Sequence, residues 1–282
     1  MNYRAVAAVA SVAIGLEAAA CSRPTVETVS VHSGSLTLRA LVWRPEGRGP
    51  FPAVLFNHGS GRTPADLATL GPYEQNAFVL GPVFAHHGYV FMYLFRRGVG
   101  MSSDQGVSSV DTMARAQTEH GVEARNTLQL RRLDGPDLDD ARSGLASLRG
   151  RVDVDRSAIT LVGHSFGASL TLLMGAREPD LRAIVVFSPA GYSWDRSAEL
   201  RARLLAAAGQ IACPVLVVHA ANDYSVAPGQ ALDAELSRLG RPHQLRIFPA
   251  NGSTPDEGHD FVNRAPGAWE RDVFSFLSHP SE

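Results

Sequence analysis

From Thr25 onward, short runs rich in apolar and β-branched residues alternate with segments of helical periodicity. This alternation constrains the fold more than any other feature of the sequence. The first two runs, Val26–His32 and Leu36–Trp43, flank a Ser-Gly turn and predict an antiparallel hairpin. The later strands alternate with helices, so right-handed crossovers should join them into a mostly parallel sheet with helices on both faces. The sequence therefore predicts an α/β fold whose leading hairpin forms an antiparallel edge.

The remaining expected elements follow in regular order along the chain. We expect buried strands at Ala53–Phe56, Tyr89–Leu94, Ile159–Gly163, Leu181–Phe187, Val215–His219 and Gln244–Phe248. We expect helices at Tyr73–His87, Thr112–Arg132, Asp137–Arg149, Ser165–Gly175, Ala198–Ala208, Gly229–Leu239 and Pro266–Leu277. Residues 99–135 are polar and bear several glycines, so we interpret them as a long, only partly helical excursion. No repeat or low-complexity segment divides the chain, and residues 25–282 are predicted to form a single domain.

Composition and charge exclude several classes of protein. Of the 282 residues 45% are apolar and 19% are charged, which is ordinary for a globular protein and excludes collagen-like and disordered chains. The net charge of −2 argues against a nucleic-acid partner, because the phosphate backbone recruits a basic protein surface. All 26 basic residues are arginine, so covalent catalysis by lysine is excluded as well.

The first twenty residues differ from the rest of the chain. Arg4 precedes an apolar run from Ala5 to Leu16, and three alanines stand directly before Cys21. This is the layout of a secretory signal peptide, and the apolar run is too short to span a bilayer. Cys21 after the small residues also resembles a bacterial lipoprotein box. We expect a protein exported to the bacterial envelope, periplasmic or held at the membrane by a lipid on Cys21; without a signal it would be cytoplasmic.

The segment Gly163-His164-Ser165-Phe166-Gly167 is a G-x-S-x-G motif between a predicted strand and a predicted helix. In such a strand–turn–helix the serine lies in a strained turn, and only glycine fits two positions to either side. The helix start brings backbone N–H groups and the positive end of a dipole to a developing negative charge. We therefore interpret Ser165 as a nucleophile, with a tight turn and a capping serine as the alternative.

A serine nucleophile needs a base to take its proton, and the base needs a carboxylate to orient it. Asp223 follows the predicted strand Val215–His219, and His259 lies in a predicted loop after the last strand. Their order along the chain is the one that accompanies this kind of elbow: serine, then acid, then histidine. Asp223 is thus the candidate orienting acid and His259 the candidate base. The competing candidates are the acids Asp256, Glu257 and Asp260 and the bases His219 and His243.

Two backbone N–H groups are candidates for an oxyanion hole, which stabilises negative charge on the substrate oxygen during acyl transfer. One is the N–H of Phe166, at the start of the predicted helix. The other is the N–H of Ser60, in the glycine-bearing loop His58-Gly59-Ser60-Gly61 after a predicted strand. The glycines let this backbone approach the substrate closely. An ordinary glycine-rich loop between a strand and a helix is the alternative.

Two further residues are candidates for substrate binding. Arg97 follows the predicted strand Tyr89–Leu94, and a guanidinium group can hold a carboxylate through two hydrogen bonds. A structural ion pair with Asp104 or Asp111 is the alternative for this arginine. Tyr224, next to the candidate acid, either lines the pocket or packs in the core. The sequence has no H-E-x-x-H or C-x-x-C motif, and we expect neither a metal nor a cofactor.

Taken together, these segments resemble the α/β-hydrolase superfamily and, more narrowly, its dienelactone-hydrolase-like branch. The motifs that stand in family order are Pro52-Ala53-Val54-Leu55-Phe56-Asn57-His58-Gly59, Arg96-Arg97-Gly98, the G-x-S-x-G motif, Asn222-Asp223-Tyr224 and Gly258-His259-Asp260-Phe261. The resemblance extends from about Thr25 to Phe276. Founding members of this branch use a cysteine nucleophile, whereas position 165 is serine, so the resemblance implies a serine esterase instead of a hydrolase of dienelactone itself.

The predicted function is a cofactor-free serine hydrolase that acts on a small-molecule carboxylic ester through an acyl-enzyme. Two alternatives stay open: a prolyl-oligopeptidase-like peptidase or amide hydrolase, and a catalytically inactive binding protein that keeps the fold. The chain between Phe187 and Val215 is too short for a large lid. Residues 99–135 are the better candidate for shaping the acyl pocket.

Overall fold

The computed structural model of the chain describes residues 24–60 and 73–280, and every structural statement below concerns these residues. The predicted signal segment over residues 1–20 and Cys21 lie outside them. Within the described part, no helix is both long enough and apolar enough to cross a lipid bilayer.

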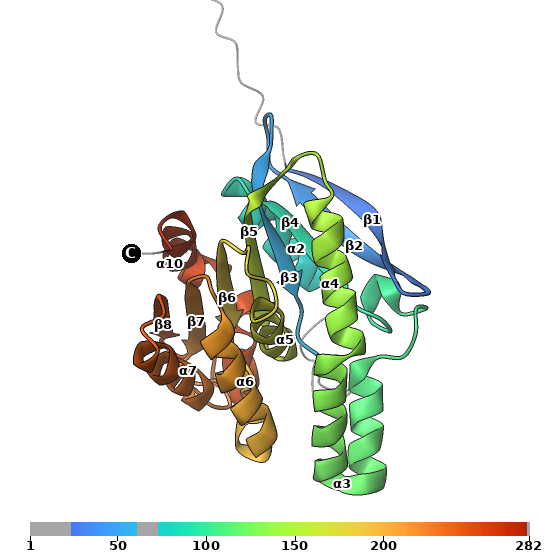
Figure 1. Cartoon of the computed structure of the whole chain (residues 1–282), viewed down its shortest axis with the longest axis vertical. Coiled ribbons are helices and arrows are strands. Elements are labelled where there is room, and N and C mark those ends of the chain that lie inside the picture. The colour runs from blue at the N-terminus through green and yellow to red at the C-terminus, as the bar shows by residue number, and fades with distance from the viewer. Residues whose placement is uncertain (1–23, 61–72, 281–282) are drawn as a thin grey trace, which may run out of the picture.

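A single mixed sheet forms the centre of the described chain, with the strand order β1-β2-β4-β3-β5-β6-β7-β8 (Figure 1). The strands are β1 (Thr25–Ser33), β2 (Leu36–Arg44), β3 (Phe51–Asn57), β4 (Val90–Phe95), β5 (Val154–His164), β6 (Ala183–Phe187), β7 (Val215–Ala220) and β8 (His243–Phe248). The pairs β1–β2 and β2–β4 are antiparallel, and every other neighbouring pair is parallel. This arrangement confirms the predicted parallel sheet with its antiparallel hairpin at one edge.

Helices cover both faces of the sheet, as Figure 1 shows. One face packs against α2 (Tyr73–His86), α9 (Phe261–Arg264) and α10 (Pro266–Ser278). The other face packs against α3 (Ser109–Asp134), α4 (Pro136–Arg149), α5 (Phe166–Gly175), α6 (Ala198–Gln210) and α7 (Ala227–Arg238). The short elements η1 (Gly100–Ser102), η2 (Trp194–Arg196) and α8 (Pro255–His259) lie in the connections.

Strand β4 shows why the sequence folds into three layers. All six of its residues are buried, and alternate side chains point to opposite faces of the sheet. Phe91, Tyr93 and Phe95 belong to the core beneath α2 and α10, whereas Val90, Met92 and Leu94 belong to the core beneath α3–α7. A strand covered on both sides therefore needs a continuous apolar run, which is what the sequence provides.

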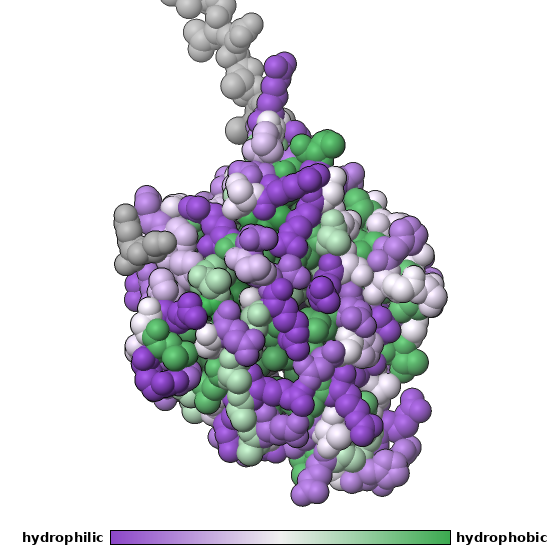
Figure 2. Space-filling model, in the orientation of Figure 1, coloured by the Kyte–Doolittle hydropathy of each residue, from purple (hydrophilic) through white to green (hydrophobic). Residues whose placement is uncertain are grey.

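The outer surfaces of the helices are polar. Figure 2 shows the face that carries α4, α5 and α6 covered mainly by hydrophilic side chains, with hydrophobic ones in small separate patches. The apolar sides of these helices are turned inward, where Leu138, Leu145 and Leu204 are buried in the core. Each such side chain contributes roughly 1.5–3 kcal/mol to stability relative to its exposed state.

The interpretation of residues 99–135 as a partly helical excursion is confirmed, because residues 103–108 lie outside any helix and the predicted helix Thr112–Arg132 is present. Helix α3 extends from Ser109 to Asp134, and the side chain of Ser108 accepts a hydrogen bond from the N–H of Asp111 at its start. Gly121 interrupts the helix with a φ of 85°, and Figure 1 shows two neighbouring coils that turn back at the end of the molecule. Few apolar residues mark this segment because its tip is exposed and only its ends pack on the core.

The expectation that His259 lies in a loop also needs correction, because it is the last residue of the short helix α8. Thr254 and Glu257 form a capping box at the start of this helix: each side chain accepts a hydrogen bond from the other residue's backbone N–H. The Thr-Pro-Asp-Glu sequence carries this signal, since proline is favoured at the first helical position. The capping box fixes the backbone that carries His259.

Candidate active site

Ser165 occupies the sharp turn between β5 and α5, as the G-x-S-x-G motif predicts. Its φ of 56° and ψ of −118° are unfavourable for a residue with a side chain and cost roughly 1–3 kcal/mol. The glycines beside it have no room for a side chain. A Cβ on Gly163 would overlap the carbonyl oxygen of Gly167, and a Cβ on Gly167 would overlap the carbonyl oxygen of Asn57. Close approach of strand and helix therefore dictates both glycines.

The structure brings Ser165, His259 and Asp223 together in one chain of hydrogen bonds. The distance from Ser165 Oγ to His259 Nε2 is 2.8 Å, and that from His259 Nδ1 to Asp223 Oδ1 is 2.7 Å. The three residues come from the β5–α5 turn, the end of α8 and the loop after β7. His259 and Asp223 are buried, with 5% and 8% of their surface exposed. Ser165 and His259 line a pocket at this edge of the sheet.

Asp223 is held as an ionised acceptor. Its Oδ1 also accepts the backbone N–H of Tyr224 at 2.7 Å, and its Oδ2 lies 2.8 Å from Nδ1 of His219. Burial raises the pKa of Asp223, but the charge interaction with His259 and the hydrogen bonds from His219 and His259 together lower this pKa below its usual range. The carboxylate can therefore orient the His259 ring and stabilise its protonated form.

The competing acids and bases have other partners. Asp256 accepts a hydrogen bond from the Tyr224 hydroxyl, Glu257 caps α8 and pairs with Arg264, and Asp260 accepts from Asn263 at 2.6 Å. His243 contacts the carbonyl oxygen of Arg241 and the hydroxyl of Ser237. The His259 ring makes its two hydrogen bonds with Ser165 and Asp223 and none with these carboxylates. Among the described residues, Asp223 is the carboxylate bonded to Nδ1 of this ring and so the one that can orient it.

Two buried histidines fix the backbone around Ser165. His164 Nε2 donates to the carbonyl oxygen of His259 at 2.8 Å, which ties the β5–α5 turn to α8. Burial and the nearby His259 lower the pKa of His164 to about 3, so this ring is neutral near pH 7. His58 contacts the carbonyl oxygen of Gly59 at 2.6 Å, and burial lowers its pKa well below the usual value. Both rings shape the site without reaching the Ser165 hydroxyl.

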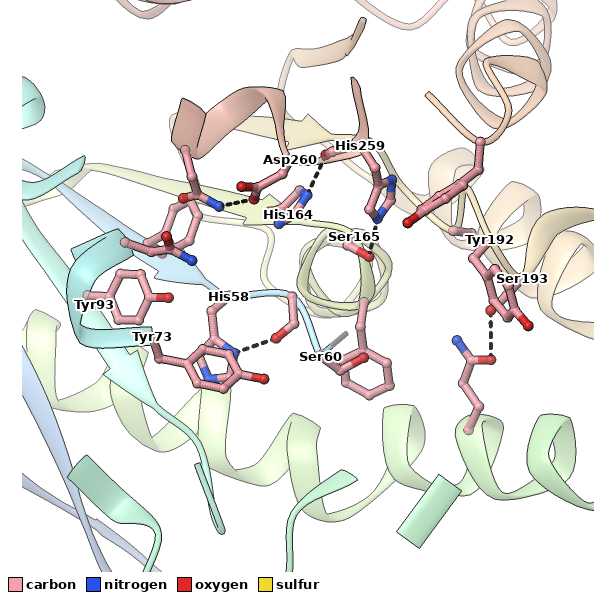
Figure 3. A pocket seen from close by; sticks show the side chains of 18 of the residues that line it. His58, Ser60, Tyr73, Tyr93, His164, Ser165, Tyr192, Ser193, His259 and Asp260 are labelled. Atoms are coloured by element: carbon pink, nitrogen blue, oxygen red, sulfur yellow. Dashed lines mark hydrogen bonds between the residues drawn. The ribbon is translucent and has the colours of Figure 1, made fainter. Parts of the chain in front are cut away.

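The loop after β3 lies against the nucleophile. A Cβ on Gly59 would stand 3.3 Å from Cβ of Ser165 and 3.1 Å from the His164 ring, so the backbone passes close to the turn. Ser60 and Phe166, the predicted oxyanion-hole residues, both line the same pocket as Ser165. Figure 3 shows Ser60 and Ser165 in this pocket. Tyr224 lines it as well, and its ring lies 4.6 Å from that of His259.

Arg97 lies outside this pocket. Its guanidinium group makes two hydrogen bonds to Asp140, at 2.9 and 2.6 Å, and Asp140 also accepts from the Ser33 hydroxyl at 2.7 Å. The predicted alternative partners are wrong: Asp104 pairs with Arg39, and Asp111 lies at the start of α3 beside Ser108. The first turns of α4 bring Asp140 to the end of β4 instead.

Sequence reasoning missed Arg125, which α3 contributes to the pocket wall. Only 5% of Arg125 is exposed, and its guanidinium donates to Gln129 at 2.9 Å and lies over the Tyr192 ring at 5.3 Å. Burial lowers the pKa of this arginine, and among the described residues no carboxylate lies within ion-pair distance of it. A single arginine in a polar helix carries no sequence signal, although residues 99–135 do shape the pocket as expected.

A metal centre has no obvious place in this part of the chain. Among residues 24–60 and 73–280, no group of three or more His, Cys, Asp or Glu side chains is arranged to hold a metal ion. The chemistry that the described site supports rests on the hydrogen bonds among a serine hydroxyl, a neighbouring imidazole and a buried carboxylate.

Solved structures with a similar fold come from hydrolases of several kinds. Acylaminoacyl peptidase of Pyrococcus horikoshii matches with a TM-score of 0.64 and 18% identity, over 92% of this chain and 42% of that chain. A hyperthermophilic esterase from Pyrobaculum calidifontis matches with a TM-score of 0.60 and 19% identity, over 92% of this chain and 87% of that chain. Dienelactone hydrolase from Anabaena variabilis matches with a TM-score of 0.58 and 17% identity, over 91% of this chain and 96% of that chain. This chain thus spans less than half of the peptidase, and identities this low show the α/β-hydrolase fold alone.

Sequence comparison identifies the family. No curated protein sequence matches the chain significantly. A model of the dienelactone hydrolase family matches residues 75–277, which is well over half of the chain and includes the G-x-S-x-G turn, Asp223 and His259. The chain therefore belongs to the dienelactone hydrolase family.

Proposed function

We propose that this protein is a serine hydrolase that cleaves small carboxylic esters, with Ser165 as nucleophile, His259 as general base and Asp223 as orienting acid. The observation that carries the proposal is the unbroken hydrogen-bond chain from Ser165 Oγ through His259 to Asp223, with links of 2.8 and 2.7 Å. A strained serine at a helix start, opening into a pocket, supports the same assignment.

The reaction has two halves. Ser165 Oγ attacks the acyl carbon while His259 Nε2 takes the hydroxyl proton, and the N–H groups of Ser60 and Phe166 stabilise the resulting oxyanion. His259 then gives that proton to the leaving alkoxide, which departs as an alcohol and leaves an acyl group on Ser165. In the second half His259 takes a proton from water as its oxygen attacks the acyl carbon. The bond between that carbon and Ser165 Oγ then breaks, His259 returns the proton to Oγ, and the acid is released. Asp223 stays ionised and stabilises the protonated His259 throughout.

The names of the family and of one similar protein support an ester, instead of an amide, as the substrate. The family is named for the hydrolysis of a lactone, which is a cyclic ester, and the Pyrobaculum protein is an esterase. The Pyrococcus peptidase supports an amide hydrolase as the second candidate, although this chain spans only 42% of it. Comparable rates on aminoacyl-arylamides and aryl esters would favour that second candidate.

Labelling with a fluorophosphonate probe and a panel of aryl esters graded by acyl length test the proposal together. The wild-type protein should react with the probe and hydrolyse short-chain esters, whereas Ser165→Ala should do neither. Ser169→Ala is the matched control, because Ser169 lies one helical turn later in α5, is buried and does not line the pocket. Undiminished labelling of Ser165→Ala would assign the nucleophile elsewhere. An unlabelled and inactive wild-type protein would instead indicate a binding protein.

A further inference from the structure

Asp223, the acid of the proposed triad, is hydrogen-bonded to a second histidine, His219, and the geometry points to a role for this histidine. We propose that His219 is a positioning residue, which fixes the Asp223 carboxylate so that one oxygen faces His259. This inference rests on the proposed function, because it assigns His219 a part in the same reaction. His219 is not among the residues that line the pocket, so it acts on the substrate only through Asp223.

The two oxygens of Asp223 are divided between different donors. Oδ1 receives His259 Nδ1 and the backbone N–H of Tyr224, both at 2.7 Å. Oδ2 lies 2.8 Å from His219 Nδ1, and the described residues place no other donor on it. A carboxylate can rotate about its last side-chain bond, and a donor on the second oxygen opposes that rotation. His219 is therefore the side chain that fixes the plane of the carboxylate.

The environment of His219 determines which nitrogen carries its proton. The side chains of His219 and Asp223 are both 0% exposed. An ionised carboxylate only accepts hydrogen bonds, so His219 Nδ1 must carry a hydrogen. Its Nε2 is buried and has no hydrogen-bond partner among the described residues. A hydrogen on Nε2 would be left unpaired in the interior, whereas a hydrogen on Nδ1 is bonded to Asp223.

The packing around the ring is specific to this arrangement. A Cβ on Gly229, in α7, would stand 2.8 Å from His219 Nε2 and 3.0 Å from a methyl group of Leu245 in β8. The Cδ2–Nε2 edge of the ring therefore faces α7 and β8, while Nδ1 points to Asp223. His219 and Asp223 are four residues apart, at the end of β7 and in the turn that follows, so a short stretch of chain sets their geometry.

Loss of the hydrogen bond should affect the chemical step and leave substrate binding unchanged. Without His219 Nδ1–H, the Asp223 carboxylate can turn its oxygens away from His259, which then loses the partner that orients its ring. The pocket wall is not altered, because His219 does not contribute to it. We therefore expect kcat to fall by about tenfold, the scale of one hydrogen bond to a charged group, while KM changes by less than about twofold.

Two amide substitutions separate this role from simple packing. His219→Asn keeps an amide nitrogen near the place of Nδ1, whereas His219→Gln carries its amide one carbon further, near Nε2. Glutamine is close to histidine in size and asparagine is smaller, so a space-filling role would weaken His219→Asn more than His219→Gln, the opposite of the order expected from the hydrogen bond. We expect His219→Asn to retain kcat within about threefold and His219→Gln to lose about tenfold, each compared on one aryl ester and on fluorophosphonate labelling rate. Equal kcat values for both variants would overturn the proposal.

A measurement on the wild-type protein covers the case in which a variant does not fold. Long-range ¹H–¹⁵N correlation spectra of ¹⁵N-histidine protein report which ring nitrogen is protonated. The signals of His219 are assigned by comparison with a variant that folds or from fully assigned spectra. The ring should carry its hydrogen on Nδ1. The Nε2–H form would overturn the proposal. An inactive, unlabelled wild-type protein would refute the proposed function instead, and the spectrum would still report on His219.

Discussion

His164 should make the stability of the protein depend on pH in a way that one substitution removes. The ring is buried, and its Nε2 donates to the backbone of His259 at 2.8 Å. Burial, and then repulsion from His259, lower the pKa of His164 from 6.5 in the unfolded chain to about 3 in the fold. Between these values the unfolded chain binds a proton that the folded protein does not, so stability is fully present above pH 6.5 and declines as the pH falls below it.

The size of the effect follows from the two pKa values. A pH of 5 lies about 1.5 units below the pKa of His164 in the unfolded chain. Each unit corresponds to about 1.4 kcal/mol, so the free energy of unfolding falls by about 2 kcal/mol. Asp260 works in the opposite direction, because burial raises its pKa to about 6 and the folded protein binds that proton first. The wild-type curve alone therefore does not isolate His164, whereas a comparison with a His164 variant does.

Urea unfolding at pH 7.5 and pH 5.0 measures this difference. His164→Gln keeps an amide nitrogen near the place of Nε2 and removes the titrating ring. The free energy of unfolding of wild type minus that of the variant should fall by about 2 kcal/mol between the two pH values. His120→Gln, on the exposed part of α3, is the matched control and should show no such change. A difference for His164→Gln that stays constant with pH would refute the reasoning.

Three further predictions concern the site and the N-terminal segment. Gly167→Ala should abolish labelling and lower stability by about 1–3 kcal/mol, because its Cβ would overlap the Asn57 carbonyl; normal thermal unfolding would contradict this. Arg125→Met should lower kcat/KM about tenfold for esters whose acyl chain ends in a carboxylate, because the guanidinium has no carboxylate partner among the described residues. An equal loss on the same substrate with its terminal carboxylate methylated would contradict this role. We also propose that Cys21 is lipidated in the bacterial envelope, so a fatty-acid analogue should label the wild type but not Cys21→Ser, and an unlabelled wild type would count against an anchor.

The sequence predicts the elements whose causes are local. Apolar runs mark the buried strands, and the two glycines around Ser165 mark the turn, because sterics within a few residues decide both. The order of Ser165, Asp223 and His259 along the chain also indicates the three side chains that the fold brings together, although it leaves competing acids and bases open. Parallel strands end at one edge of the sheet, so residues that follow them meet there.

Long-range pairings are less accessible from the sequence. Arg97 and Asp140 are 43 residues apart, and only the course of α3 and α4 decides that they meet. The place of Arg125 depends on the turn at Gly121, where a positive φ folds the polar helix back on itself. The sequence indicates His219 as a competing base. It does not predict the contact between His219 Nδ1 and Asp223 Oδ2, because that contact depends on the turn after β7.

The central claim is that the hydroxyl of Ser165 carries the acyl group during turnover. It is tested most directly by mixing the protein with a short-chain p-nitrophenyl ester, quenching with acid within the first turnover and mapping the modified peptide by mass spectrometry. We expect a burst of one p-nitrophenol per protein and the mass of the acyl group on Ser165. Steady turnover of the ester with the acyl group on another residue, or on none, would contradict the account.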